Sequence, residues 1–316
     1  MTTTDVIERP IHKRVLKLMG NRFEISVVSD DKVWAESQID AAVAEIQRIE
    51  RLLTTFSEDS QTNQINGHAG IKPVKVDREV FDLIQRSLRI SELTQGAFDI
   101  TYGSIDKSLW NFDTKMIALP DPETAKRMVR LINYRNVLLD TEGGTVFLKN
   151  TGMRIGFWGI GKGYADEKAK RMMIQNGVES GIVNAAGDLT TWGQQPDGSP
   201  WTIGITDPDA KEYPFSYLNI SDMAVATSGN YEKLAVSKGK RYSHTIDPKT
   251  GLPVSGIKSV TIISPNAEIA DAMAIPVTVM GIEVGLNLIN QMRGLACIII
   301  DDNNKIYTSK NIRIRH

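Results

Sequence analysis

The sequence is poor in cysteine and in long apolar runs. Among its 316 residues Cys297 is the one cysteine, so no disulfide within the chain and no cysteine metal cluster is expected. No apolar stretch is long enough to span a bilayer, and the first residues show neither the apolar core nor the cleavage site of a secretory signal. As given, the sequence therefore predicts a cytoplasmic protein without a membrane span.

The sequence also lacks a surplus of charge. It has 37 Lys and Arg against 38 Asp and Glu, which gives a formal net charge of −1. A nucleic-acid-binding protein usually carries a basic surplus, so no nucleic-acid partner is expected. The hydrophobic fraction of 41% and the charged fraction of 24% are ordinary for a globular protein with an ample core.

Helical and strand patterns alternate along the chain without a regular strand–helix–strand order. Apolar residues at helical spacing and helix-capping signals predict helices: 33–53, 78–94, one starting at 121, 164–175, 267–280 and 282–291. Alternating or β-branched runs bounded by turn residues predict strands: 14–28, 137–148, several between 181 and 263, and 295–308.

This mixture predicts an α+β fold with antiparallel sheets and packed helices rather than a doubly wound sheet. Residues 1–13 are expected to form a flexible tail, and 14–316 a single domain. The polar segment 54–77, with its glycines and proline, is expected to be a long loop.

A glycine-rich stretch at 156–163 has nearly the spacing of a phosphate-binding P-loop. It departs at the last position, where Gly163 replaces the Ser or Thr that holds magnesium, so a nucleoside triphosphatase is not predicted. A glycine-rich turn with Lys162 at a helix N-terminus still suits a phosphate or pyrophosphate. A tight turn with a surface lysine explains the same residues equally well.

Four further residues are candidates for catalysis or ligand binding. His244 lies beside hydroxyl residues and close to Asp247, so it is the best candidate for a general base among the four histidines. Asp271 is flanked by alanines on a predicted helix, which leaves room for a hard cation such as magnesium. Close helix packing through those alanines is the alternative. Phe98 could stack on a ligand ring or belong to the core, and Asp188 could be a ligand or a turn residue.

The order of the motifs along the chain is more specific than any one of them. Taken together, they resemble the ApbE family over roughly residues 18–300. The motifs that carry this resemblance are Met19-Gly20, the Phe56…Ser60…Asn66 loop, Gly96-Ala97-Phe98-Asp99, Gly161-Lys162-Gly163-Tyr164-Ala165, Asn184-Ala185-Ala186-Gly187-Asp188, Thr227-Ser228-Gly229-Asn230-Tyr231, His244-Thr245-Ile246-Asp247-Pro248-Lys249-Thr250-Gly251 and Ala270-Asp271-Ala272.

The resemblance implies a fold and a reaction. The family fold is a single α+β domain of the T-fold-like kind. Its members are FAD:protein FMN transferases, often exported lipoproteins, that use magnesium to hold the FAD pyrophosphate. A Thr or Ser of an acceptor flavoprotein, typically a subunit of a redox complex, attacks the FMN phosphorus, a phosphoester forms and AMP leaves.

The resemblance also implies roles for individual residues. Asp271 and the carbonyl of Gly159 would bind magnesium, and His244 would assist deprotonation of the acceptor hydroxyl, so His244 and Asp271 are the expected catalytic residues. The residues expected to bind FAD are Met19, Phe56, Ala97, Phe98, Asp99, Gly156, Lys162 and Thr245.

Several positions depart from the family pattern. Ile275 stands where a threonine is usual, four residues after Asp271 and on the same helix face. Trp158 stands in a turn where small residues are usual and is expected to fill part of the ligand space. Gly156 replaces a frequent aspartate, and Ala186 replaces the first glycine of a Gly-Gly-Asp. These changes keep open an FAD-binding paralogue without transferase activity. An FAD pyrophosphatase, with water as the nucleophile, is a further alternative.

Overall fold

The computed structural model describes residues 9–110, 119–206, 214–229, 234–237 and 240–312. The helices, with 3₁₀ helices written η, are α1 (Lys32–Leu53), α2 (Gln61–Gly67), α3 (Arg78–Leu93), η1 (Ile100–Ser104), α4 (Pro122–Met128), η2 (Tyr134–Asn136), α5 (Gly161–Gln175), α6 (Ala267–Met280) and α7 (Ile282–Gln291). The strands are β1 (Ile11–Leu18), β2 (Asn21–Val28), β3 (Val74–Lys75), β4 (Val137–Asp140), β5 (Thr145–Leu148), β6 (Gly181–Ala185), β7 (Asp188–Trp192), β8 (Trp201–Thr206), β9 (Pro214–Ile220), β10 (Ala224–Gly229), β11 (Leu234–Ser237), β12 (Lys240–Ser243), β13 (Ile257–Ser264), β14 (Ala296–Asp301) and β15 (Ile306–Thr308).

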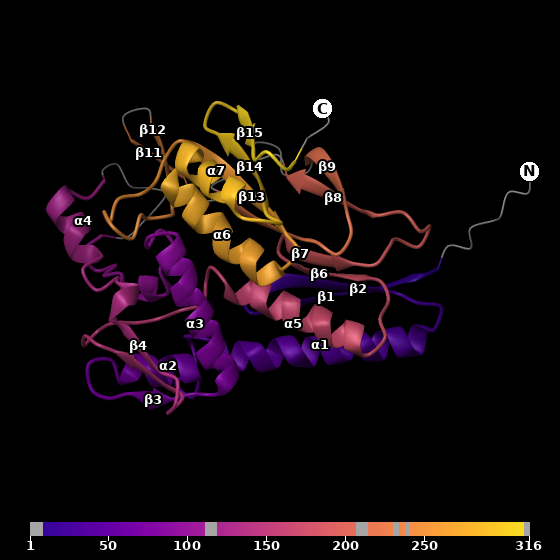
Figure 1. Ribbon diagram of the computed structural model, residues 1–316, viewed down its shortest axis with the longest axis horizontal. Coiled ribbons are helices and arrows are strands. Elements are labelled where there is room, and N and C mark those ends of the chain that lie inside the picture. The colour runs from indigo at the N-terminus through magenta and orange to yellow at the C-terminus, as the bar shows by residue number, and fades with distance from the viewer. Residues whose placement is uncertain (1–8, 111–118, 207–213, 230–233, 238–239, 313–316) are drawn as a thin grey trace, which may run out of the picture.

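An eight-stranded sheet in the order β1-β2-β6-β7-β10-β13-β14-β15 forms the centre of the fold, and every neighbouring pair is antiparallel. Helices α1, α5, α6 and α7 cover one face of this sheet (Figure 1). The hairpin β8–β9 packs on the opposite face, where Trp201 and Ile203 join a second apolar cluster.

Strand β10 contributes side chains to the apolar clusters on both faces of the sheet. Val225 belongs to the cluster under the β8–β9 hairpin, whereas its neighbours Ala224 and Ala226 face the helices. Successive strand side chains point to opposite faces, so a strand buried on both faces is apolar at nearly every position. The same reasoning accounts for β14, which is buried throughout and apolar up to Asp301, whereas β13 is also buried throughout although half of its residues are polar.

A smaller region packs beside the sheet and contains α2, α3, α4 and the three-stranded sheet β3-β5-β4 (Figure 1). The prediction of a long loop over 54–77 was wrong here, because α2 and β3 lie within that segment. Helix α2 begins at the cap residue Ser60, whose hydroxyl accepts from the backbone N of Asn63 at 3.1 Å. Its seven residues include one large apolar side chain, Ile65, so it shows no helical periodicity.

The α+β class with antiparallel sheets and packed helices is confirmed, as are the helices predicted at 33–53, 78–94, 164–175, 267–280 and 282–291, each within a few residues. Strand β1 begins at Ile11, so residues 11–13 belong to the sheet rather than to the expected tail. Residues 1–8 lie outside the described ranges. Within those ranges, no helix combines the length and the apolar character that crossing a membrane requires.

Candidate functional site

Two adjoining pockets lie where the sheet, α5 and the smaller region meet. The first has a volume of about 300 Å³ and is lined by Ala97, Phe98, Asp99, Tyr102, Gly156, Trp158, Gly159, His244, Thr245, Ile246, Pro248 and Ile275. The second has a volume of about 260 Å³ and is lined by Met19, Gly20, Asn21, Glu50, Leu53, Thr54, Thr55, Phe56, Phe157, Trp158, Gly161 and Lys162. Trp158 lines both.

The structure thus divides the predicted site residues between these two pockets. Met19, Phe56 and Lys162 lie in the second pocket. The first pocket holds the other predicted binding residues, together with Gly159 and His244. The Asp271 carboxyl lies behind this surface, where it is 5% exposed.

Two hairpin turns position residues at one end of the sheet. Met19 (φ 49°) and Gly20 (φ 74°) connect β1 to β2, and Ala186 (φ 56°) and Gly187 (φ 103°) connect β6 to β7. Positive φ at both residues is typical of the two-residue turns that match strand twist. Met19 and Ala186 adopt it without being glycine, which costs conformational energy and marks this sheet end as a candidate site. Ala186 thus takes a backbone conformation that the usual glycine would adopt more readily.

The N-terminus of α5 packs tightly against α6, and this explains part of the glycine-rich motif. A Cβ on Gly163 would lie 2.2 Å from the Ala267 carbonyl oxygen and 2.7 Å from the Asp271 Cβ. The backbone N of Gly163 also donates to Asp271 Oδ2 at 3.0 Å. Because the first N–H groups of a helix have no partner within it, Asp271 serves as an acceptor for α5.

The partly exposed Lys162 and three buried aspartates form a cluster, which we call the Lys162 cluster: Lys162, Asp166, Asp188 and Asp271. The Lys162 ammonium forms an ion pair with Asp188 and lies 3.9 Å from Asp271 Oδ1. Burial alone would lower the pKa of Lys162, but the charges of Asp271 and Asp188 raise it above its ordinary value. Burial raises the pKa of Asp271 to about 6, with Lys162 opposing the shift and Asp188 adding to it.

Asp166 lies one helical turn after Lys162 and is 0% exposed, and neither carboxyl oxygen has a hydrogen-bond partner among the described residues. Burial raises its pKa well above the ordinary value, Lys162 opposes this, and Asp188 and Asp271 add to it. A buried carboxylate without partners is costly, so the structure favours a protonated Asp166. With Asp166 protonated, the carboxylates of Asp188 and Asp271 still outnumber the Lys162 ammonium, a surplus that favours binding of a cation.

The candidate base and its neighbours lie in the first pocket. His244 is exposed at a bend directly after β12, and the backbone N of the next residue, Thr245, donates to the Ser243 hydroxyl at 2.8 Å. Asp99 also lines this pocket, but its carboxylate accepts from the backbone N of Thr101 at 2.8 Å and of Tyr134 at 2.9 Å. These bonds give Asp99 a local structural role as the cap of η1.

The predicted magnesium residues lie on opposed elements. A Cβ on Gly159 would be 3.0 Å from Cδ1 of Ile275, which places the Ile275 side chain against the turn before α5. Asp271 and Ile275 are one turn apart on α6. Across the described ranges, no group of three or more His, Cys, Asp or Glu side chains could hold a metal. Magnesium can bind through one carboxylate with substrate phosphates and water, so the role of Asp271 and Gly159 in binding the ion stays a prediction.

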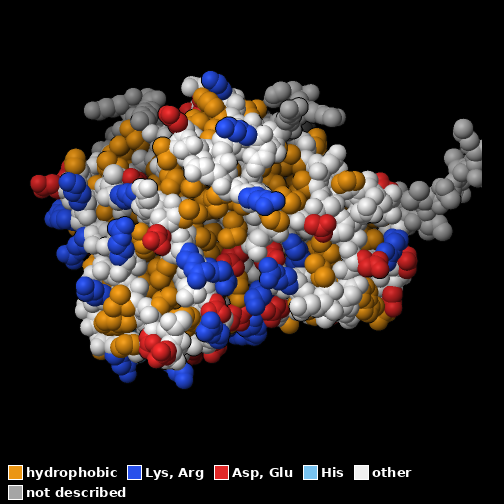
Figure 2. Space-filling view, viewed as in Figure 1, with side chains coloured by type: hydrophobic (Ala, Val, Ile, Leu, Met, Phe, Trp, Pro, Cys, Tyr) orange, Lys and Arg blue, Asp and Glu red, His pale blue; other side chains and the backbone are white. Residues whose placement is uncertain are grey.

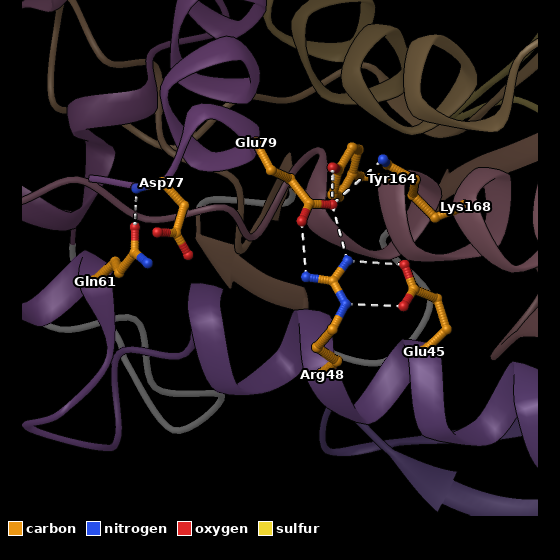
Figure 3. A network of polar contacts seen from close by, with 7 residues as sticks. All are labelled: Glu45, Arg48, Gln61, Asp77, Glu79, Tyr164 and Lys168. Atoms are coloured by element: carbon orange, nitrogen blue, oxygen red, sulfur yellow. Dashed lines mark hydrogen bonds and ion pairs between the residues drawn. The ribbon is translucent and has the colours of Figure 1, made fainter. Parts of the chain in front are cut away.

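A second polar network lies on another face of α5 and serves as a contrast. We call it the Glu79 network: Glu45, Arg48, Glu79, Tyr164 and Lys168 (Figure 3). Arg48 donates to Glu45 at 2.8 Å and to Glu79 at 2.7 Å, and the Tyr164 hydroxyl also donates to Glu79. Burial of Glu79 raises its pKa, but the bonds from Arg48 and Tyr164 outweigh burial and lower it to about 2. Two acids and two cations balance here.

The face shown in Figure 2 is not dominated by side chains of one charge sign. Acidic and basic side chains are intermingled over the face shown in Figure 2. One groove in the described surface, of about 300 Å³, contains both Arg86 and Glu268, which pair at 2.6 Å.

Sequence reasoning missed Asp166 and the pocket residues Tyr102, Leu53 and Glu50. The signal for Asp166 was present: Lys162, Asp166 and Lys170 follow at steps of four and so share one helix face. These three side chains lie on the face of α5 that packs on the sheet. There Lys170 Nζ donates to the Thr190 hydroxyl at 3.1 Å. The predicted motif at 227–231 is described only to Gly229, so Asn230 and Tyr231 lie outside the described residues.

Comparison with known proteins gives consistent matches over most of the chain. The ApbE family model matches residues 19–299. The chain is 31% identical over 300 residues to an FAD:protein FMN transferase of Klebsiella pneumoniae, covering 94% of this chain and 92% of the relative. It is 30% identical to the FAD:protein FMN transferase of Treponema pallidum, with 87% and 81% covered.

Solved structures agree with this. The ApbE protein of Thermotoga maritima superimposes with a TM-score of 0.84 at 31% identity, covering 95% of this chain and 97% of that one. The flavinyl transferase ApbE of Pseudomonas stutzeri gives a TM-score of 0.84 at 26% identity, with 97% of each chain covered.

Proposed function

The chain belongs to the ApbE family, and from this premise we propose that it is an FAD:protein FMN transferase. The observation that carries the proposal is the pair of adjoining pockets on either side of Trp158, with Lys162 in the wall of one. FAD has two ring systems joined through a pyrophosphate. Two ring-sized pockets with a cation beside them match that shape and charge.

In the proposed reaction, a Thr or Ser hydroxyl of an acceptor flavoprotein attacks the FMN phosphorus of FAD. The new bond joins the acceptor oxygen to that phosphorus, and the bond from phosphorus to the bridging pyrophosphate oxygen breaks. AMP leaves with the bridging oxygen, and the hydroxyl proton passes to a base. A subunit of a redox complex is the acceptor that fits this chemistry.

The chain's own residues have distinct tasks in this proposal. His244 lies exposed in the first pocket, where an incoming hydroxyl could reach the ring and transfer its proton. Lys162 offers positive charge to the pyrophosphate oxygens, whose charge increases in the transition state. The remaining predicted binding residues would enclose the two rings.

We propose magnesium as the metal because the predicted donors are oxygen atoms. Asp271 would hold it with the Gly159 carbonyl, and the ion would supply charge neutralisation at the pyrophosphate. The Lys162 cluster supports this, because a cation offsets the cost of burying the Asp188 and Asp271 carboxylates beside one ammonium. Ile275 adds no ligand atom, so water or substrate oxygen would complete the coordination.

The direct test measures transfer. The protein is incubated with FAD, magnesium and a redox subunit that a known relative flavinylates, and the intact mass of the acceptor is determined. We expect a mass increase of one FMN that requires magnesium and is lost with EDTA, together with an equal amount of released AMP.

The other outcomes separate the alternatives. A flavin-binding paralogue would bind FAD but leave the acceptor unmodified, while the relative modifies the same acceptor in parallel. The observation that favours this alternative is the Ile275 side chain, which lies against Gly159. AMP release without acceptor would identify a pyrophosphatase.

A further inference from the structure

Trp158 is unusually exposed for its position. Its neighbours Phe157 and Ile160 are 6% and 0% exposed, whereas Trp158 is 53% exposed. The indole lines the first pocket together with Phe98 and the second pocket together with Phe56. A large aromatic surface left outside the core, inside a cleft, is typical of a ligand-contact position.

Two glycines make room for this indole. A Cβ on Gly156 would lie 2.2 Å from Cζ3 of Trp158, and a Cβ on Gly103 would lie 2.9 Å from its Cη2. Neither glycine has the positive φ that would require glycine for backbone reasons. Their missing side chains are therefore explained by the indole, and the three residues form one packed unit that fixes where Trp158 stands.

We propose that Trp158 is a specificity-determining residue that forms the partition between the two pockets and contacts both ring systems of FAD, one on each side. This rests on the proposed function, because it takes FAD as the ligand. The indole is a flat, electron-rich surface, and aromatic rings of a ligand gain from contact with it beyond the area that they bury. A ligand with one ring system uses one side of the partition, and FAD uses both.

The inference predicts a pattern of affinities rather than a simple loss. Removing the indole weakens FAD binding more than it weakens the binding of FMN or AMP alone. An aromatic contact contributes about 0.5–1.5 kcal/mol, which corresponds to about two- to tenfold in affinity for each side. Trp158→Ala is expected to weaken FAD binding about tenfold or more, and Trp158→Phe, which keeps a smaller ring, only about threefold.

A second variant moves the indole without deleting it. Gly156→Ala adds a methyl group where the indole now lies, so the ring must leave its place. We expect this variant to weaken FAD binding about as much as Trp158→Ala. In the double variant there is no indole to displace, so Gly156→Ala should add nothing further. Non-additivity of this kind is what double-mutant cycles detect.

The experiment is calorimetric titration of the full chain and its four variants (Trp158→Ala, Trp158→Phe, Gly156→Ala and the double variant) with FAD, FMN and AMP, after thermal unfolding has shown that each is folded. The proposal is overturned if Trp158→Ala binds FAD as tightly as the parent chain. It is also overturned if FAD and single-ring ligands weaken equally, or if Gly156→Ala acts equally in both backgrounds. Absence of FAD binding by the parent chain would instead overturn the proposed function, so the two failures are distinguishable.

Discussion

Helix α5 carries two polar clusters, one on each of two faces, and they differ in charge balance. In the Glu79 network two acids meet two cations, and the pKa of Glu79 is lowered to about 2. In the Lys162 cluster three acids meet one cation, and the pKa of Asp271 is raised to about 6. The balanced network connects α1, α3 and α5 (Figure 3), so we interpret it as a contact that stabilises the fold. The unbalanced cluster contains carboxyl groups with raised pKa values, and shifts of this kind are frequent at functional sites.

Asp271→Asn is expected to have the largest effect. The amide keeps an oxygen that can accept from the Gly163 N–H, so the α5–α6 contact survives, but the negative charge is lost. If Asp271 holds magnesium, transfer to the acceptor should fall about 100-fold or more, the scale of losing one preorganised charge at a reacting centre. The rate of acceptor mass increase measures this. Unchanged transfer at every magnesium concentration would remove Asp271 from the metal site.

Glu79→Gln tests the opposite cluster and serves as the matched control. It removes the acceptor charge of Arg48 and Tyr164, so the free energy of unfolding at pH 7 should fall by about 2 kcal/mol, with the transfer rate of the folded protein retained. The folded pKa of Glu79 is below the ordinary value of 4.5, so this stability is present above about pH 4.5 and is lost as pH falls toward 2. Urea unfolding at pH 7, 4 and 2.5 should show the two proteins converging. A constant difference would contradict the assignment.

Asp166→Asn should act in the other direction. The pKa of Asp166 is higher in the folded protein than its ordinary value of 3.8. The parent chain therefore loses folding stability as pH rises from about 3.8 to the folded pKa, because over this range the unfolded chain releases the proton that the folded chain still holds. A neutral amide of similar shape avoids this cost. The variant should therefore gain on the parent chain as pH rises, by about 1 kcal/mol for each unit of pKa shift, with no gain near pH 3. Unfolding curves from pH 3 to 8 measure it. A loss of stability at pH 8 would mean that Asp166 is ionised and paired with a cation.

The sequence predicted most of the helices from local pattern and part of the pocket lining from the order of the motifs, but it did not predict Tyr102, Leu53 or Glu50. It could not predict α2, whose seven residues contain one large apolar side chain. It also could not divide the site residues between two pockets, since this depends on where the folded chain places Trp158, which lines both. The sequence left the glycine-rich stretch open between a phosphate-binding turn and a tight turn with a surface lysine. The structure adds a packing reason for two of its glycines: Gly163 allows contact between helices, and Gly156 accommodates an indole.

Ile275→Thr is expected to have the smallest effect. It tests the comparison by adding one possible metal-ligand oxygen beside Asp271 of the Lys162 cluster. Ile275 lies one turn from Asp271, and its Cδ1 reaches the Gly159 position that is predicted to offer a carbonyl to magnesium. A threonine hydroxyl there would supply an oxygen where a methyl group now stands. We expect the magnesium concentration for half-maximal transfer to fall about threefold, the scale of one added neutral hydrogen-bonding contact. The half-buried position should limit the loss of folding free energy to about 1 kcal/mol. Ile275→Val, which shortens the side chain without adding oxygen, is the control. An equal change in magnesium requirement in both variants would mean that space, not coordination, is what Ile275 controls.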